Sequence, residues 1–301
     1  MKPRIAVSIL HYNSLVSLQQ VIEAVKSQTL APDKILILDN GSEEDVSCLK
    51  DIYSDLELIK LNENLGVGHG HNFAWKHLIN KYSPEFIWAL EHDSIPEPNN
   101  LMTLFQEFKN SGDQVMAINS VEKNSFDYKK YSYFKVRIPN VVKLEDKDLV
   151  SNYFGGLSFN GVLIPVSTLE KVGYLREDFF IGFEDIDFSR RIYKSGGKVL
   201  RITNSYVYHD VFKKHRSFKI GNRVFLFPGN EPFREYYSFR NSLVVHQKPL
   251  LFFIKIIFSV FYILLFRRRK IANISAKVLG FRDAMVGRLG KREYSILNLN
   301  W

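Results

Sequence analysis

The sequence is almost devoid of cysteine. Its 301 residues contain one, Cys48, in a stretch rich in Asp, Glu and Lys. A single cysteine can form no internal disulfide and belongs to no cysteine-based metal cluster. Disulfide-stapled folds are therefore excluded, and a reducing compartment is favoured.

The amino terminus also lacks the pattern of a secretory signal. In MKPRIAVSILHYNS only a few apolar residues follow the basic start before Tyr12 and Asn13 interrupt them, so we expect the fold to begin at once. The sequence shows no internal repeat or low-complexity tract. With 46% hydrophobic residues, the composition excludes a disordered or collagen-like chain and predicts one large or two modest globular domains.

Negative charge is scarce toward the carboxyl terminus. Residues 213–301 hold 18 Lys and Arg against 4 Asp and Glu, whereas residues 1–212 hold 23 against 28. The net charge of +9 is therefore a property of the last third of the chain. On charge alone, this basic region suits nucleic acid, anionic lipid or a phosphorylated substrate equally well.

The first hundred residues alternate between buried strands and helices. Apolar runs end in polar turns, and a helical pattern lies between the first two runs. The predicted strands cover residues 4–10, 34–39, 56–61 and 85–93. This order is typical of an α/β fold with a mostly parallel sheet that helices cover on both faces. Ligands bind beyond the carboxyl ends of such strands, so we expect the turns HYNS, DNGS and EHDS to meet in one crevice.

The rest of the chain carries a weaker pattern. We predict a helix near 99–110, a long loop over 120–150, a strand in 153–165, and a turn, helix and strand over 182–202. Residues 203–248 have a loop-like, aromatic composition. From Pro249 the character changes completely, so we place a domain boundary there. Residues 1–248 would form the main domain, and residues 249–301 a basic and apolar helical region.

Two carboxylates separated by one residue end the fourth predicted strand. A short turn lets Glu91 and Asp93 face one point, and their oxygen ligands select Mg²⁺ or Mn²⁺. The alternative is an exposed acidic turn or a helix cap at Asp93, since Ser-Ile-Pro-Glu-Pro follows. The pair by itself is a weak indication of a metal site.

Two further motifs have both a functional and a structural interpretation. The Gly-rich segment 66–72 can present backbone N–H groups to a ligand, but it also suits a tight loop at a helix start. Glu184, Asp185 and Asp187 begin a predicted helix, whose free N–H groups stabilise anions. They are either ordinary caps or include a general base, which must be ionised to take a proton from a hydroxyl.

Candidate ligands continue toward the carboxyl terminus. His209 follows a strand-like stretch and becomes a metal ligand only if it approaches Asp93; otherwise it is a structural residue. The segment REYYSFRN, residues 234–241, combines the guanidinium groups of Arg234 and Arg240, suited to phosphate, with aromatic surface. It equally fits a solvated helix face with two tyrosines in the core.

Taken in order, these motifs resemble those of the family 2 inverting glycosyltransferases, which share the GT-A fold. SILHYNS and ILDNGS are similar to the two nucleotide-binding strand ends, NLGVGHGHNFA to the Gly-rich turn, EHD to the metal motif and GFEDIDF to the acidic catalytic motif. YYSFRN resembles a signature of the rhamnosyltransferase-like and galactofuranosyltransferase-like branch. The resemblance spans residues 4–245 and implies a nucleotide-binding half, 1–98, and an acceptor-binding half, 99–248.

The resemblance implies a role for each candidate residue. Asp185, beside Glu184, would deprotonate the acceptor hydroxyl. Mn²⁺ or Mg²⁺ would be held by Asp93, Glu91 and His209, with Asp93 the safer ligand because the motif departs from the common acidic pattern at Glu91 and His92. The donor nucleotide would be bound by His11, Tyr12 (which would pack on the base), Asn13, Asp39 (which would accept from the base or ribose), Asn40, Gly66, Asn72, Glu91 and His92. The acceptor or diphosphate would be contacted by Gly156, Tyr237, Arg240 and Asn241.

The implied activity is metal-dependent, inverting transfer of a sugar from a nucleotide-diphosphate donor to a hydroxyl of a glycan or lipid-linked acceptor, as in bacterial-type cell-surface polysaccharide synthesis. The branch favours dTDP-rhamnose, with a UDP-sugar next. One alternative is a metal-dependent nucleotidyltransferase, which would release pyrophosphate. Another is a non-enzymatic nucleic-acid-binding protein, which is disfavoured because the aromatic residues of the basic region form an apolar run instead of an interleaved stacking surface.

One long apolar run stands out, PLLFFIKIIFSVFYILLFRRRK. Residues 250–266 give 17 positions with a single charge, short of the roughly 20 needed to span a membrane. A polar stripe of Lys255, Ser259 and Tyr262 runs along the predicted helix, and four basic residues follow. We therefore expect residues 250–270 to lie on the anionic inner face of the cell membrane, as in a peripheral cytoplasmic protein. A buried hairpin helix or a homo-oligomer interface is the alternative.

Overall fold

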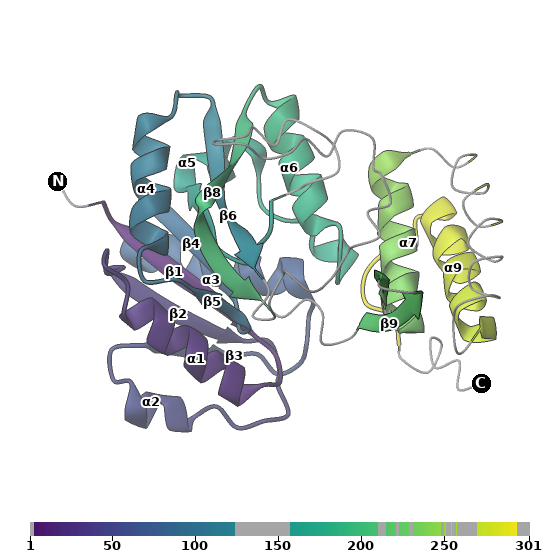
Figure 1. Ribbon diagram of the computed structural model, residues 1–301, viewed down its shortest axis with the longest axis horizontal. Helices are drawn as coiled ribbons and strands as arrows, with labels where there is room; N and C mark the ends of the chain where they lie inside the picture. Colours follow the sequence, from purple (N-terminus) through teal and green to yellow (C-terminus); the bar gives the residue numbers. More distant parts are fainter. Residues whose placement is uncertain are drawn as a thin grey trace.

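A central sheet carries helices on both faces, and α7 (Pro232–His246) and α9 (Lys270–Met285) stand beside it (Figure 1). The computed structural model describes residues 3–123, 157–209, 215–220, 223–228, 231–247, 250, 254, 257 and 270–293. Its strands are β1 (Ile5–His11), β2 (Lys34–Asp39), β3 (Glu57–Lys60), β4 (Phe86–Glu91), β5 (Ser94–Pro96), β6 (Val115–Lys123), β7 (Val162–Pro165), β8 (Lys198–His209), β9 (His215–Ile220) and β10 (Arg223–Pro228). Its helices are α1 (Leu15–Lys26), α2 (Cys48–Ile52), α3 (Val67–Tyr82), α4 (Asn100–Asn110), α5 (Val166–Val172), the short 3₁₀ turn η2 (Glu177–Phe179), α6 (Glu184–Lys194), α7 (Pro232–His246) and α9 (Lys270–Met285).

The sheet is parallel in its first half and mixed in its second. Its strand order is β3-β2-β1-β4-β7-β6-β8-β5. The first four of these strands pair in parallel, as the sequence predicts. β7 runs antiparallel to β4 and β6, and β5 runs antiparallel to β8. The parallel half brings the carboxyl ends of β1, β2 and β4 to one edge, where ligands of such sheets bind.

Two apolar layers sandwich the sheet. α1 and α4 cover one face with side chains such as Leu18 and Leu101, whereas α3 and α6 cover the other with Trp75 and Phe188. β1 is buried along its whole length because alternate side chains of a strand point to opposite faces. This double burial explains why the strands appear in the sequence as continuous apolar runs.

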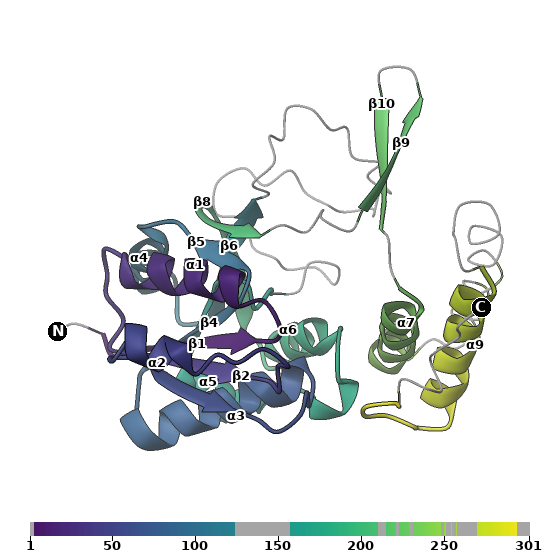
Figure 2. The ribbon, with the colours of Figure 1, turned by 90° about the horizontal axis from the view of Figure 1, so that it is seen from below.

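The prediction of a loop-like stretch over residues 203–248 is wrong. β8 continues to His209, the β9–β10 hairpin follows and projects from the body, and α7 begins with Pro232 in its first turn (Figure 2). Tyr236, Phe239 and Leu243 are buried and recur at the three- and four-residue spacing of a helix face. This spacing is the sequence pattern that indicates the helix α7. β6 also enters the predicted 120–150 loop as far as Lys123, and residues 124–156 lie outside the described residues.

The described part of the basic region packs on the main domain. α7 and α9 lie side by side in both views (Figures 1 and 2), and Ala276 packs with Tyr236 and Tyr237. A Cβ on Gly280 would lie 2.8 Å from the Tyr236 carbonyl oxygen, so glycine permits this close approach. Most of the apolar run falls outside the described residues, and the boundary at 249 stays a prediction. Within the described ranges, no helix is long and apolar enough to cross a membrane.

Candidate active site

A crevice opens at the carboxyl ends of β1, β2 and β4, where the sequence predicts that three polar turns meet. Its volume is about 980 Å³, a size suited to a nucleotide-sized ligand. Phe180 and Phe233 contribute apolar surface from the opposite side. Of the residues expected to bind the donor, those that line it are His11, Tyr12, Asn40, Gly66, Glu91 and His92.

Hydrogen bonds between the turns after β1 and β2 support this crevice from beneath. The Asn13 N–H donates to Ser42 Oγ at 2.9 Å, and Asn13 Oδ1 accepts from the Glu43 N–H at 2.9 Å. Asp39 is fully buried. Its Oδ1 accepts from the Ser42 N–H at 2.9 Å, and its Oδ2 lies 3.6 Å from Lys60 Nζ. Asp39 and Asn13 therefore hold the turns together and do not line the crevice.

The Gly-rich segment brings backbone close to the crevice. Gly66 has a φ of +95°, and a Cβ there would lie 2.3 Å from the Phe180 carbonyl oxygen, so only glycine fits. Asn40 Nδ2 donates to the Gly66 carbonyl at 3.1 Å. Asn72 is buried, and its amide bonds both the N–H and the carbonyl of Leu175 at 2.9 Å. Asn72 thus ties α3 to a neighbouring segment and does not line the crevice.

Asp93 and His209 meet although 116 positions separate them, as their numbers in the sequence show. β5 pairs with β8 so that Ser94 lies opposite His209, and His209 Nε2 lies 3.2 Å from Asp93 Oδ2. His209 Nδ1 lies 3.7 Å from Glu122 Oε2 and 3.2 Å from Asn160 Nδ2. Sequence reasoning missed Glu122 and Asn160, because Glu122 belongs to a stretch predicted as a loop and neither residue stands in a motif.

The groups around His209 have altered proton affinities. Burial opposes protonation of His209, but its hydrogen bonds to Asp93 and Glu122 prevail and raise its pKa to about 10. Burial, followed by the charge of Asp93, raises the pKa of Glu91 to about 7. At neutral pH and without a bound metal, His209 is therefore a cation beside these carboxylates.

Glu184 and Asp185 begin α6, and both have raised pKa values. Burial, reinforced by the charge of Asp185, raises the pKa of Glu184, and burial also raises the pKa of Asp185. The Ile186 N–H donates to Asp185 Oδ1 at 2.7 Å, whereas Glu184 Oε2 is buried without a hydrogen-bond partner. A proton taken up by the pair therefore resides on Glu184, and Asp185 is the carboxylate that ionises first.

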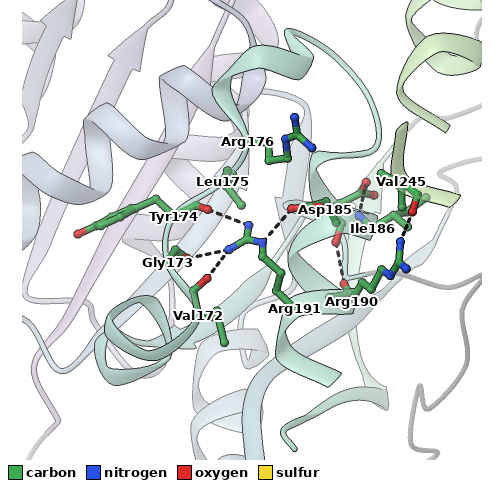
Figure 3. A network of polar contacts seen from close by, with 12 residues as sticks. Val172, Gly173, Tyr174, Leu175, Arg176, Asp185, Ile186, Arg190, Arg191 and Val245 are labelled. Carbon is green, nitrogen blue, oxygen red and sulfur yellow. Dashed lines mark hydrogen bonds and ion pairs between the residues drawn. The ribbon is translucent and has the colours of Figure 1, made fainter. Parts of the chain in front are cut away.

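Two arginines fix the position of α6. Arg191 points at the carbonyl oxygens of residues 172–174 and pairs with Asp187 at 2.8 Å (Figure 3). Arg190 donates to the Val245 carbonyl near the end of α7 (Figure 3). α6 is thus held on both sides, which keeps the two carboxylates at its start in place. Asp187, the third acid of GFEDIDF, belongs to this anchor.

The α7 residues expected at the acceptor or diphosphate are buried. Arg240 donates to the carbonyls of Gly290 at 2.8 Å and Phe179 at 2.9 Å. Tyr237 and Asn241 are also fully buried. Asn241 Nδ2 donates to the carbonyls of Phe179, Ile181 and Gly182 at distances of 3.0, 3.1 and 2.8 Å. None of the three lines the crevice, and instead they hold the segments around it. Gly156 lies outside the described residues.

The cations of the crevice come from an unexpected part of the chain. Arg234, Lys291 and Arg292 all line it. Arg234 belongs to the segment REYYSFRN, but Lys291 and Arg292 lie beyond the resemblance and were missed. No sequence motif could indicate them, because their position depends on how the chain returns after α9.

The residues at the end of β4 fit a divalent cation. Asp93 Oδ1 is buried without a hydrogen-bond partner, which leaves one carboxylate oxygen available. Carboxylate and imidazole are ligands that Mn²⁺ accepts. In the described part of the chain, no three His, Cys, Asp or Glu side chains form a ready metal cage. A cation here would complete its shell with phosphate oxygens and water.

The chain belongs to glycosyl transferase family 2, whose pattern matches residues 6–162, more than half of its length. It is 24% identical to the dTDP-rhamnosyl transferase RfbF of Shigella flexneri, over 98% of this chain and 100% of that protein. It is also 24% identical to the uncharacterized glycosyltransferase RP339 of Rickettsia prowazekii (strain Madrid E), over 71% of this chain and 64% of the relative.

Solved structures share the fold. The mannosyltransferase PcManGT from Pyrobaculum calidifontis, in complex with GDP-Man and Mn²⁺, superposes with a TM-score of 0.56 at 16% identity, over 82% of this chain and 63% of that one. GalNAc-T7 with UDP, GalNAc and Mn²⁺ gives 0.56 at 14% identity, over 81% and 48%. This chain thus spans less than two thirds of either neighbour. The predicted GT-A fold, family and enzyme class are confirmed: the protein is a family 2 glycosyltransferase.

The proton on His209 can be tested directly. In the metal-free protein we expect His209 to stay protonated at pH 8, and Asp93→Asn to lower its pKa by roughly 1–3 pH units because a charge 3.2 Å away is lost. Titration of the imidazole ¹⁵N signals by NMR measures both. Asp113→Asn, an exposed carboxylate elsewhere, should change nothing. Titration of His209 near its ordinary value in the unaltered protein would contradict the ion pair.

Proposed function

We propose that the protein transfers a sugar, with inversion, from a nucleotide-diphosphate donor to a hydroxyl of a glycan or lipid-linked acceptor. The observation that carries this proposal is the meeting of Asp93, Glu122 and His209 next to the 980 Å³ crevice. Of the metal motif, Glu91 and His92 line the crevice, and Asp93 follows them in the chain. dTDP-rhamnose is the favoured donor and a UDP-sugar the next. The similarity to dTDP-rhamnosyl transferase RfbF along almost the whole chain supports that order.

The donor would lie with its base near Tyr12 and its diphosphate toward Asp93. Tyr12 is 39% exposed, which leaves its ring available for packing. Asp93, His209 and Glu91 would hold Mn²⁺ or Mg²⁺. When bound, this ion would neutralise charge that develops on the departing diphosphate. Support comes from the unpartnered Asp93 oxygen and from structural neighbours solved with Mn²⁺.

Asp185 would act as the general base. It is the carboxylate of the Glu184–Asp185 pair that ionises first, and its raised pKa brings it closer to neutral pH, where a base accepts a proton most effectively. It would take the proton from the acceptor hydroxyl while that oxygen attacks the anomeric carbon opposite the diphosphate. Glu184, whose pKa burial and the charge of Asp185 raise, would stay protonated and so limit the negative charge beside the incoming hydroxyl.

Contact with an anionic membrane is part of the same proposal. Leu250, Ile254 and Ile257 are helical positions spaced four and three apart, and all three are exposed. On the helix that the sequence predicts here, positions four and three apart share one face, and exposed apolar side chains on that face suit a membrane surface. A lipid-linked acceptor would then lie close to the enzyme at the inner face of the membrane.

Donor and metal can be tested together by thermal shift with a panel of nucleotide sugars, with and without Mn²⁺. We expect dTDP-rhamnose to raise Tm most and Mn²⁺ to enlarge that shift. Asp93→Ala should abolish the Mn²⁺-dependent part, because it removes a ligand. Asp113→Ala is the control. An Mn²⁺-dependent shift that survives in Asp93→Ala would refute the ligand assignment, and release of pyrophosphate in place of the nucleoside diphosphate would refute sugar transfer.

The base can be tested with Asp185→Asn. We expect donor affinity to be retained and transfer to fall by roughly 100-fold or more, since general bases contribute about that much. The matched control is Asp187→Asn in the same helix turn, because Asp187 pairs with Arg191 and should affect stability more than transfer. Full activity in Asp185→Asn would end its role as base.

Membrane contact can be tested by flotation with vesicles. We expect the full chain to float with vesicles that contain phosphatidylglycerol and not with pure phosphatidylcholine. Replacing Arg267, Arg268 and Arg269 with Gln should abolish flotation, because each basic side chain contributes about 1 kcal/mol near an anionic surface. Arg288→Gln, which removes one exposed basic side chain outside residues 250–270, is the control and should leave flotation unchanged. Equal behaviour on both vesicle types would contradict the proposal.

A further inference from the structure

The two walls of the crevice differ in charge. The wall built from the first half of the chain carries carboxylates, whereas, among the described residues, every lysine or arginine that lines the crevice comes from beyond residue 230. The carboxylates of the first wall are Glu43, Glu63 and Glu91; the opposite wall carries Arg234, Lys291 and Arg292 together with Glu231 and Glu293. A group with two phosphates between the walls would meet the metal motif on one side and guanidinium groups on the other.

Residues 290–293, which we call the strap, return to the crevice after α9. Figure 2 shows the chain turning back toward the body beyond that helix. The Gly290 N–H donates to the Asp178 carbonyl at 2.6 Å, and the Gly290 carbonyl accepts from Arg240 Nη1 at 2.8 Å. Lys291 Nζ reaches Glu63 Oε2 at 2.6 Å across the crevice. The strap is therefore tied to both halves of the protein.

The side chain of Arg292 is oriented from behind. Its Nη2 pairs with Asp283 Oδ2 at 2.9 Å, and its backbone N–H donates to Tyr237 Oη at 2.8 Å. Asp283 is fully buried and also accepts from Tyr236 Oη at 2.7 Å. Arg292 Nε is buried without a hydrogen-bond partner. Asp283 on α9 thus fixes one edge of the Arg292 guanidinium, whereas the Nε–H of that group has no hydrogen-bond acceptor.

Arg234 occupies the first turn of α7 and is a second cation of this wall. No hydrogen bond or ion pair within the described ranges engages its guanidinium, and its charge acts on Glu91, whose pKa it lowers against the larger effects of burial and Asp93. Guanidinium groups bind phosphate through paired N–H donors, which makes Arg234 and Arg292 suitable partners for a diphosphate.

We propose that the strap is part of the donor site, where Arg292 and Arg234 bind the diphosphate of the nucleotide sugar from the wall opposite Glu63 and Glu91. Tyr237 and Arg240 are positioning residues, because they hold the strap backbone and do not line the crevice. This inference rests on the proposed function, and it gives two buried residues of the YYSFRN segment a role in holding the strap.

The test measures affinity for UDP and dTDP, and for uridine and thymidine, by calorimetric titration of the full chain in the presence of Mg²⁺. We expect Arg234→Gln and Arg292→Gln each to weaken binding of the diphosphates by about tenfold or more, because a charge-assisted bond to phosphate is lost. Affinity for the nucleosides should not change. Arg288→Gln removes an exposed cation two residues before the strap and should leave all four affinities unchanged.

Tyr237→Phe tests the positioning role. It removes the oxygen that accepts the Arg292 N–H, so we expect weaker diphosphate binding by several-fold with unchanged nucleoside binding. A purely structural role would lower Tm without changing the ratio of the two affinities. If Arg292→Gln fails to fold, Arg234→Gln decides alone, since its guanidinium supports no described contact.

Two outcomes separate the proposals. If the unaltered protein binds UDP or dTDP and both arginine variants bind them equally well, the strap inference is wrong and the proposed function stands. If the unaltered protein binds neither diphosphate, both are overturned.

Discussion

The balance of charge at the carboxyl ends of the strands is the constraint on which this protein depends. Burial and the repulsion of nearby carboxylates raise the pKa values of Glu91 and Glu184, whereas at Asp93 and Glu122 the hydrogen bonds to His209 outweigh burial and lower the pKa. His209, protonated between Asp93 and Glu122, offsets part of this repulsion. Such a cluster of carboxylates destabilises the protein when no metal is bound, and it is typical of a cation-binding site.

The surrounding structure keeps these groups in register. The parallel strands bring their turns to one edge, and the pairing of β5 with β8 aligns Asp93 with His209. Arg190 and Arg191 anchor α6 to the segments on either side of it, which holds the start of the helix in place (Figure 3). Many hydrogen bonds near the crevice therefore hold its backbone segments in place and do not contact a ligand. Only a few side chains remain for ligand binding and catalysis.

Buried polar residues outside the acidic cluster also hold backbone segments of the crevice in place. Asn72, Arg240 and Asn241 bond backbone carbonyls in the segments that border the crevice. A buried amide or guanidinium must find such partners, because an unsatisfied polar group costs about 1–3 kcal/mol. The result is that α7 supports both the segment before α6 and the chain that returns after α9. The region after residue 249 thus contributes to the main domain through α9. This contribution does not depend on membrane contact by the apolar run 250–266.

By itself, the sequence determined the strands of the first half, because each is a local apolar run buried on both faces. The approach of His209 to Asp93 was only implied by the family resemblance, and the tertiary structure brings the two side chains together. The sequence could not indicate Glu122, Asn160, Lys291 or Arg292, which reach the crevice only through long-range packing. Nor could it separate Asp39, Asn72 and Arg240, buried supports, from Tyr12 and Asn40, which line the crevice. Burial is decided by which elements pack together, and only the tertiary structure holds that information.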